Sequence, residues 1–125
     1  MKTARILSGL LGFVLLMLGV EWVVDPQAAA EGLALLYFEG EGRNTLIRDF
    51  TAFFLGTSFM CFLGLLTKNY QYMVSVTIIF VIAFAANVYA GIAHGAPMIV
   101  TAAISELIFS IMAITSAVLM KANIN

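Results

Sequence analysis

Five polar side chains lie within or next to long apolar stretches, and they are the residues of this sequence that could do chemistry. They are Arg48, Asp49, Asn87, His94 and Glu106. Polar groups embedded in lipid are costly and usually face the protein interior or a cavity. We therefore treat the five as candidate ligand-binding residues, for a small molecule, a lipid headgroup or an ion. An embedded carboxyl such as that of Glu106 could also act as an acid or a base.

Glu106 is the plainest of the five, because it falls inside the last apolar stretch. A charged residue at the centre of a membrane helix costs about 2.5–3.5 kcal/mol, whereas each Leu, Ile, Phe or Val returns about 0.3–0.6 kcal/mol. The stretch from Ile99 to Leu119 holds enough of these residues to offset that cost without a partner. Glu106 shares a helix face with small residues, namely Ala102, Ala103, Ser110 and Ala113. Because small residues allow helices to approach closely, we predict that Glu106 points into a helix bundle.

Arg48 and Asp49 begin the second apolar stretch. Arg48 heads a stripe at helical spacing that continues through Ala52, Gly56, Met60 and Gly64. This stripe predicts that Arg48 faces the bundle interior. An arginine near a helix N-terminus meets the unfavourable end of the macrodipole and favours an anionic partner, whereas Asp49 suits that end. The alternatives are that Arg48 reaches the lipid headgroups and that Asp49 only begins the helix.

Asn87 and His94 belong to the third apolar stretch and the connection after it. Asn87 shares a face with small residues, and His94 follows two turns later on the same side. At about 1.5 Å per residue, Arg48 lies about 5 Å, Asn87 about 8 Å and Glu106 about 14 Å inside the outer boundary. We predict a funnel that opens outward, with Arg48 at its mouth, Asn87 on its wall and Glu106 at its floor. As alternatives, Asn87 bonds a neighbouring helix, His94 is solvated, and Glu106 is a protonated acid bonded to a neighbouring helix.

The elements that position these residues follow from the composition. The 125 residues are 62% hydrophobic and 10% charged, whereas soluble domains are about 45–50% apolar and about 25% charged. A membrane helix needs about 20 mostly apolar residues, and four windows qualify, at about 5–24, 45–66, 72–92 and 97–120. We predict an all-α fold, in which residues 1–125 form one integral membrane domain built as a four-transmembrane-helix bundle.

The connection between the first two windows, at about 25–44, is too long for a plain turn. Asp25-Pro26 favours a helix start, with an acid at the N-cap and proline at the first helical position. Leu33, Leu36 and Tyr37 would then share one face. We predict a short interfacial helix in this first outer connection, with an irregular loop as the alternative.

The basic residues predict the orientation. Lys2, Arg5, Lys68 and Lys121 lie on one side of the predicted bundle, and Arg43 and Arg48 lie on the other. The positive-inside rule therefore places both termini in the cytoplasm.

Several classes of function have no support in the sequence. The net charge is −1 and no basic cluster occurs, so we expect no nucleic-acid partner. The patterns of zinc proteases, serine hydrolases and phosphate-binding loops are missing, and the single Cys61 and His94 make no pair for a metal. We expect no metal and no cofactor, and we assign no catalytic residue.

The order of short motifs resembles a known group of proteins. Asp25-Pro26 follows the first window, Asn44 and Arg48-Asp49 open the second with Gly56 behind them, and Gly95-Ala96-Pro97 leads to the helix with Glu106. In this order the chain resembles an uncharacterised family of small four-helix bacterial membrane proteins, defined as a domain of unknown function. More loosely, it resembles DoxX-like membrane proteins. The resemblance implies a multi-pass protein of the bacterial inner (cytoplasmic) membrane without an assigned activity.

The chain departs from this resemblance at two positions. Such proteins often carry arginine where this chain has Asn87, and an acid where it has His94. An arginine at 87 could pair with Glu106. Here Arg48 is left as the only embedded cation on the outer side that could do so.

Three hypotheses for the function remain open. The first is a non-enzymatic membrane protein whose polar pocket in the outer leaflet binds a small molecule, a lipid headgroup or an ion, or serves only for packing. The second is an accessory or assembly subunit of a larger membrane complex, or a homo-oligomer, that meets its partner through lipid-facing aromatic residues. These are Phe50, Phe53, Phe54 and Phe80. The third is a membrane isomerase or redox enzyme that uses Glu106 as an acid or a base.

Overall fold

The computed structural model describes residues 1–124, and within this range the chain is helical and contains no strand. Its elements are α1 (Lys2–Val24), α2 (Pro26–Gly32), α3 (Gly40–Thr67), α4 (Tyr70–Ala93) and α5 (Val100–Ala122). The four long helices are long and apolar enough to cross a membrane. The predicted fold class is therefore confirmed, and the chain is a multi-pass helical membrane protein.

The short helix in the first connection is also confirmed, although it ends earlier than predicted. Asp25 caps α2, because its Oδ1 accepts a hydrogen bond from the Ala28 backbone nitrogen at 3.3 Å, and Pro26 occupies the first helical position. The helix stops at Gly32, and Ala34 adopts a left-handed φ of 58°. Residues 33–37 therefore form an irregular segment rather than one face of this helix.

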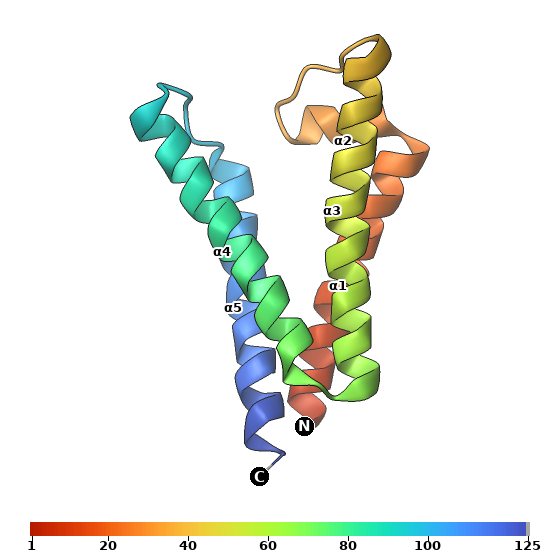
Figure 1. Cartoon of the computed structure of the whole chain (residues 1–125), viewed down its shortest axis with the longest axis vertical. Coiled ribbons are helices and arrows are strands. Elements are labelled where there is room, and N and C mark those ends of the chain that lie inside the picture. Colours follow the sequence, from red (N-terminus) through yellow and green to blue (C-terminus); the bar gives the residue numbers. More distant parts are fainter. Residues whose placement is uncertain (125) are drawn as a thin grey trace.

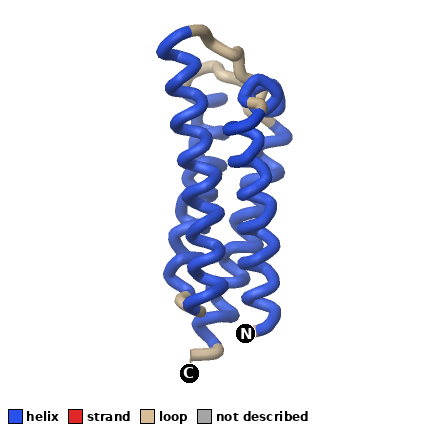
Figure 2. Tube along the Cα trace, turned by 90° about the vertical axis from the view of Figure 1, so that its right-hand side faces the viewer, coloured by secondary structure: helices blue, strands red, loops and turns tan. Residues whose placement is uncertain are grey.

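The long helices form two pairs that meet at one end and diverge at the other (Figure 1). α1 packs mainly against α3, and α4 packs mainly against α5. Both termini lie at the closed end, whereas α2 lies at the diverging end. Figure 2 shows the long helices following one common axis, with α2 lying across it. The two ends are called here the terminal end and the α2 end.

Small residues bring α1 and α3 into close contact. A Cβ added to Gly12 would lie 3.0 Å from Cys61 Cβ, and one added to Gly19 would lie 2.4 Å from Leu55 Cδ2. Ser58 Oγ donates a hydrogen bond to the Gly12 carbonyl at 2.7 Å. Close packing and hydrogen bonds of this kind hold helices together where lipid removes the hydrophobic driving force.

The buried face of α3 differs from the predicted stripe. The residues of α3 that are buried are Phe54, Thr57, Ser58, Cys61 and Gly64. Ala52 is exposed, and no described heavy atom lies within 4 Å of a Cβ added to Gly56. The prediction was wrong because small residues occur on two faces of α3. α1 packs on the face that carries Ser58, whose hydroxyl reaches the Gly12 carbonyl.

The terminal end has a continuous core that joins the two pairs. Ala4, Met73, Ala113 and Met120, one or more from each of α1, α4 and α5, are fully buried. Ser116 Oγ of α5 donates a hydrogen bond to the Ala4 carbonyl of α1 at 2.7 Å. Beyond Phe80, by contrast, the described residues of α4 are not buried. The pairs are therefore fixed together at the terminal end and separate toward the α2 end.

Candidate functional site

A cavity of about 220 Å³ lies between the two helix pairs, in the half of the bundle that carries α2. All five helices contribute to its lining. Its wall is mainly apolar and aromatic, and its polar side chains are Glu21, Thr101, Ser105 and Glu106. The divergence of the helix pairs creates this space, because the part of α4 that follows Phe80 is not buried in the common core.

Aromatic rings from four helices form much of the cavity wall. They are Trp22, Phe53, Phe54, Phe80 and Phe109. The Phe53 and Phe80 rings meet edge to face with centroids 5.5 Å apart, and Phe80 meets Phe109 in the same way at 5.2 Å. This series of contacts crosses from α3 to α4 to α5, so it links the two helix pairs beside the cavity.

Glu106 is half-buried in the cavity wall, and its carboxyl lacks a full set of partners. Its Oε2 is buried and has no hydrogen-bond partner among the described residues. The Ser110 hydroxyl donates to the Glu106 backbone carbonyl at 2.7 Å, which leaves the side chain unaffected. The structure thus agrees with the prediction that Glu106 turns toward the bundle interior. An unpaired buried carboxyl oxygen is costly, and because Glu106 also lines the cavity, it is a candidate for contact with a ligand.

Asn87 has a structural contact that accounts for its side chain. Its Nδ2 donates to the Ile99 carbonyl, and its Oδ1 accepts from the Ile99 nitrogen, both at 3.1 Å. Ile99 is the residue that precedes α5, so this amide holds the start of α5 against α4. Asn87 also neighbours the Glu106 carboxyl. Of the five predicted candidates, the structure therefore brings Asn87 and Glu106 together.

Arg48 and Asp49 lie away from the cavity, and the prediction that Arg48 faces inward is wrong. Arg48 Nε donates to Asp49 Oδ1 at 2.9 Å, and the two side chains are 65% and 59% exposed. Because α3 buries the face around Ser58 and Cys61, position 48 turns outward. The predicted funnel with Arg48 at its mouth is therefore not formed.

His94 also lies apart from the cavity. It is exposed, it ends α4, and its ring meets that of Tyr89 with centroids 5.8 Å apart. The interpretation of His94 as a solvated residue agrees with this position.

The aromatic residues assigned to a lipid-facing flank were placed wrongly. Phe54 and Phe80 are buried, and Phe53 lines the cavity with them. Phe50 stacks on Trp22 with ring centroids 4.8 Å apart. Their exposure was misjudged because large apolar side chains in a membrane span are as compatible with a protein interior as with lipid.

Sequence reasoning also missed Glu21 and Trp22 as cavity residues. The available signal was their spacing, since Leu18, Glu21 and Trp22 lie within one helical turn and all line the cavity. Nothing in the sequence relates this turn to Glu106, which lies on a helix distant in the chain.

Comparison with known proteins gives no match to a family model, a curated protein or a solved structure. The resemblance to the small four-helix family and to DoxX-like proteins therefore stays a prediction.

Proposed function

We propose that this protein is a non-enzymatic binding protein of the bacterial inner membrane, with both termini in the cytoplasm and a small-molecule site in the outer half of the bilayer. The observation that supports the site is the cavity itself, whose wall combines Glu106 with aromatic rings. A mostly apolar cavity with a few convergent polar groups is the usual form of a small-molecule site.

The exposed surface supports the membrane location. Large apolar side chains are exposed along all four long helices, for example Phe13, Phe59, Ile82 and Ile111. Soluble monomers rarely expose continuous apolar surface of this extent, whereas lipid tails are its natural solvent.

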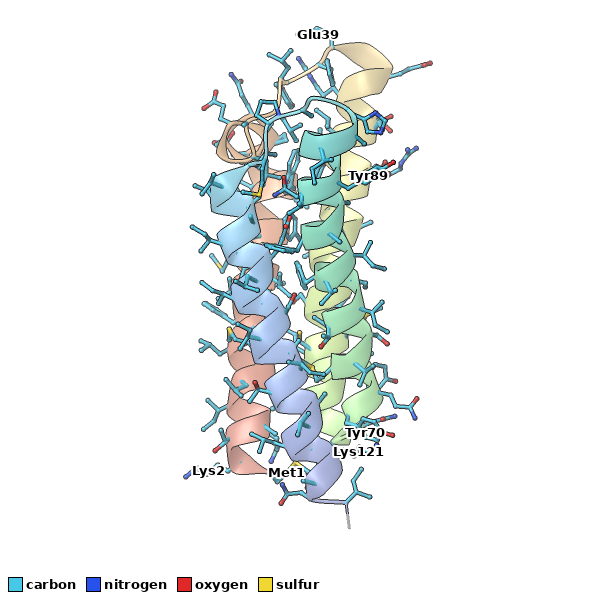
Figure 3. All side chains as sticks on the ribbon, turned by 90° about the vertical axis from the view of Figure 1, so that its left-hand side faces the viewer. Met1, Lys2, Glu39, Tyr70, Tyr89 and Lys121 are labelled. Atoms are coloured by element: carbon cyan, nitrogen blue, oxygen red, sulfur yellow. The ribbon has the colours of Figure 1, made fainter. Side chains whose placement is uncertain are left out.

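The ends of the bundle support the orientation. Lys2 and Lys121 lie at the terminal end, whereas Glu39 lies at the α2 end (Figure 3). Tyr70 is close to Lys121 at the same end, with the ammonium nitrogen 5.5 Å from the ring centroid. Basic residues are in excess on the cytoplasmic side of a membrane, and tyrosine is typical of either interface.

The size of the cavity favours a small molecule over a whole lipid. An engineered protein cavity of about 150 Å³ holds benzene, so the 220 Å³ observed here accommodates one ring with a short substituent. The ligand that fits is therefore a compact molecule with an apolar body and one polar end directed at Glu106.

The sole tryptophan gives a direct test, because Trp22 lines the cavity. The bromine atom of bromobenzene quenches tryptophan fluorescence at short range, so titration into nanodiscs that hold the protein should quench Trp22 with saturation. In the matched control, Trp22→Phe is combined with Phe13→Trp, which moves the fluorophore to an exposed position. Quenching of the control should rise linearly with the bromobenzene concentration. Linear quenching of both proteins would contradict the proposed site.

One observation favours the alternative of an accessory subunit or homo-oligomer. Only 11% of the apolar window of α4 is buried, against 28–33% in the other long helices. This helix has the most surface available for a partner chain. A larger assembly after gentle purification, lost when bulky residues of the outer α4 surface such as Ile82 are replaced, would support that role.

A further inference from the structure

We infer that the ligand of this cavity is a small organic cation, namely a protonated amine on a compact apolar body. The ammonium group lies against Glu106 and the apolar body lies among the aromatic rings. This inference rests on the proposed function and specifies the chemical class of its ligand.

The charges that line the cavity support a cation. Glu21 and Glu106 both line it, and the described residues of its wall include no Lys, Arg or His. A carboxylate in apolar surroundings is strongly destabilised unless a cation pairs with it. An ammonium group on the ligand supplies that cation, and its N–H groups donate hydrogen bonds to a carboxylate.

The protein's own arginines at the α2 end are already paired elsewhere. Arg43 Nη2 lies 2.7 Å from Glu39 Oε1, with its guanidinium over the Tyr37 ring. Arg48 is paired with Asp49 on the exposed side of α3. Neither guanidinium is therefore positioned to neutralise the cavity carboxyls.

The distribution of acids extends this argument to the whole α2 end. All seven Asp and Glu residues of the chain lie in this half of the bundle, together with only two of the six Lys and Arg residues. The resulting negative potential attracts cations toward the cavity and repels anions. A phosphate or carboxylate ligand is disfavoured for the same reason.

The wall of the cavity favours an organic cation over a metal ion. Within residues 1–124, no three His, Cys, Asp or Glu side chains come close enough together to hold a metal ion. Instead, Glu106 shares the cavity wall with aromatic rings. Aromatic rings attract organic ammonium groups through their π faces, and tryptophan does so most strongly.

A matched pair of brominated probes tests this inference in nanodiscs of zwitterionic phosphatidylcholine. The probes are 4-bromobenzylamine, which is protonated at neutral pH, and its neutral isostere 4-bromobenzyl alcohol. Quenching of Trp22 should saturate with the amine, at an apparent Kd lower than that of the alcohol by about tenfold or more. Glu106→Gln should abolish this preference, whereas Glu31→Gln, which removes an exposed acid outside the cavity, should retain it.

The outcomes separate this inference from the proposed function. Saturable quenching by the alcohol at an equal or lower Kd would show a neutral ligand and would overturn the inference, while leaving the proposed site intact. A preference for the amine that survives Glu106→Gln would also overturn it. Linear quenching by both probes would contradict the inference together with the proposed site. The comparison of the two probes on the unmodified protein holds even if a variant fails to fold.

Discussion

Replacing Gly19 by alanine should weaken the contact between α1 and α3, because the glycine leaves no room for a side chain. A Cβ at position 19 would lie 2.4 Å from Leu55 Cδ2, 2.8 Å from Leu55 Cγ and 3.2 Å from the Leu55 backbone nitrogen. A new Leu55 rotamer relieves the first two contacts but not the third. The two helix backbones must therefore also move slightly apart.

The expected size of the effect comes from comparison with a matched glycine. Overpacking of this kind costs about 1–3 kcal/mol. Gly56→Ala makes the same change in α3, where no described heavy atom lies within 4 Å of the added Cβ. Both variants gain the same helix propensity, about 1 kcal/mol, so this gain cancels between them. Gly19→Ala should be less stable than Gly56→Ala by about 1–3 kcal/mol. This difference corresponds to a change of about 5- to 150-fold in the equilibrium constant for separation of α1 from α3.

The sole cysteine provides the assay without denaturant. Cys61 is fully buried in the same α1–α3 contact, so N-ethylmaleimide reaches its thiol only when the helices separate. If closing is faster than labelling, the labelling rate follows the equilibrium population of the open form. The rate for Gly19→Ala should exceed the rate for Gly56→Ala by the factor given above. Equal rates for the two variants would refute the close approach of α1 and α3.

Three further predictions concern single side chains. Asn87→Ala removes two hydrogen bonds to Ile99, each worth about 0.5–1.5 kcal/mol. The rate of amide hydrogen exchange at the start of α5 should therefore rise, and an unchanged rate would contradict the assigned contact. Arg48→Gln breaks an exposed ion pair with Asp49 and should change the free energy of unfolding by at most about 1 kcal/mol. The affinity of the cavity probes should not change, and a loss of affinity would show that Arg48 takes part in binding. Trp22 is 1% exposed, so its emission should be blue-shifted and resist quenching by acrylamide, and emission typical of solvated indole would contradict its burial.

The helices could be predicted from the sequence because their signals are local. Length and apolar composition identify a membrane span without reference to the rest of the chain, and Asp25-Pro26 identifies the start of α2 by its own capping chemistry. The inward direction of Glu106 was also local, because small residues of α5 share its face. The residues of each helix, taken alone, were thus largely sufficient to predict these features.

The cavity could not be predicted, because it depends on which surfaces meet. α3 offers small residues on two faces, and only the presence of α1 decides that Ser58 is buried and Arg48 exposed. The aromatic wall joins Phe53, Phe80 and Phe109 from three helices. In a membrane span, such residues are as compatible with lipid as with a protein interior, so hydropathy does not distinguish the two positions.

The sizes of the buried side chains explain why the cavity lies at the α2 end. Near the terminal end, small residues and a hydroxyl take part in the contacts between the pairs beside the flexible Met73 and Met120, and Ser116 donates to the Ala4 carbonyl at 2.7 Å. Further along, the contacts between pairs are made by Phe80 and its ring neighbours, whose centroids are more than 5 Å apart. Bulky rings hold the helix axes apart, and the rigid helices extend that separation toward the α2 end. Glu106 lines the cavity with these rings. Its Oε2, the one buried carboxyl oxygen without a hydrogen-bond partner among the described residues, therefore lies where the bundle begins to open.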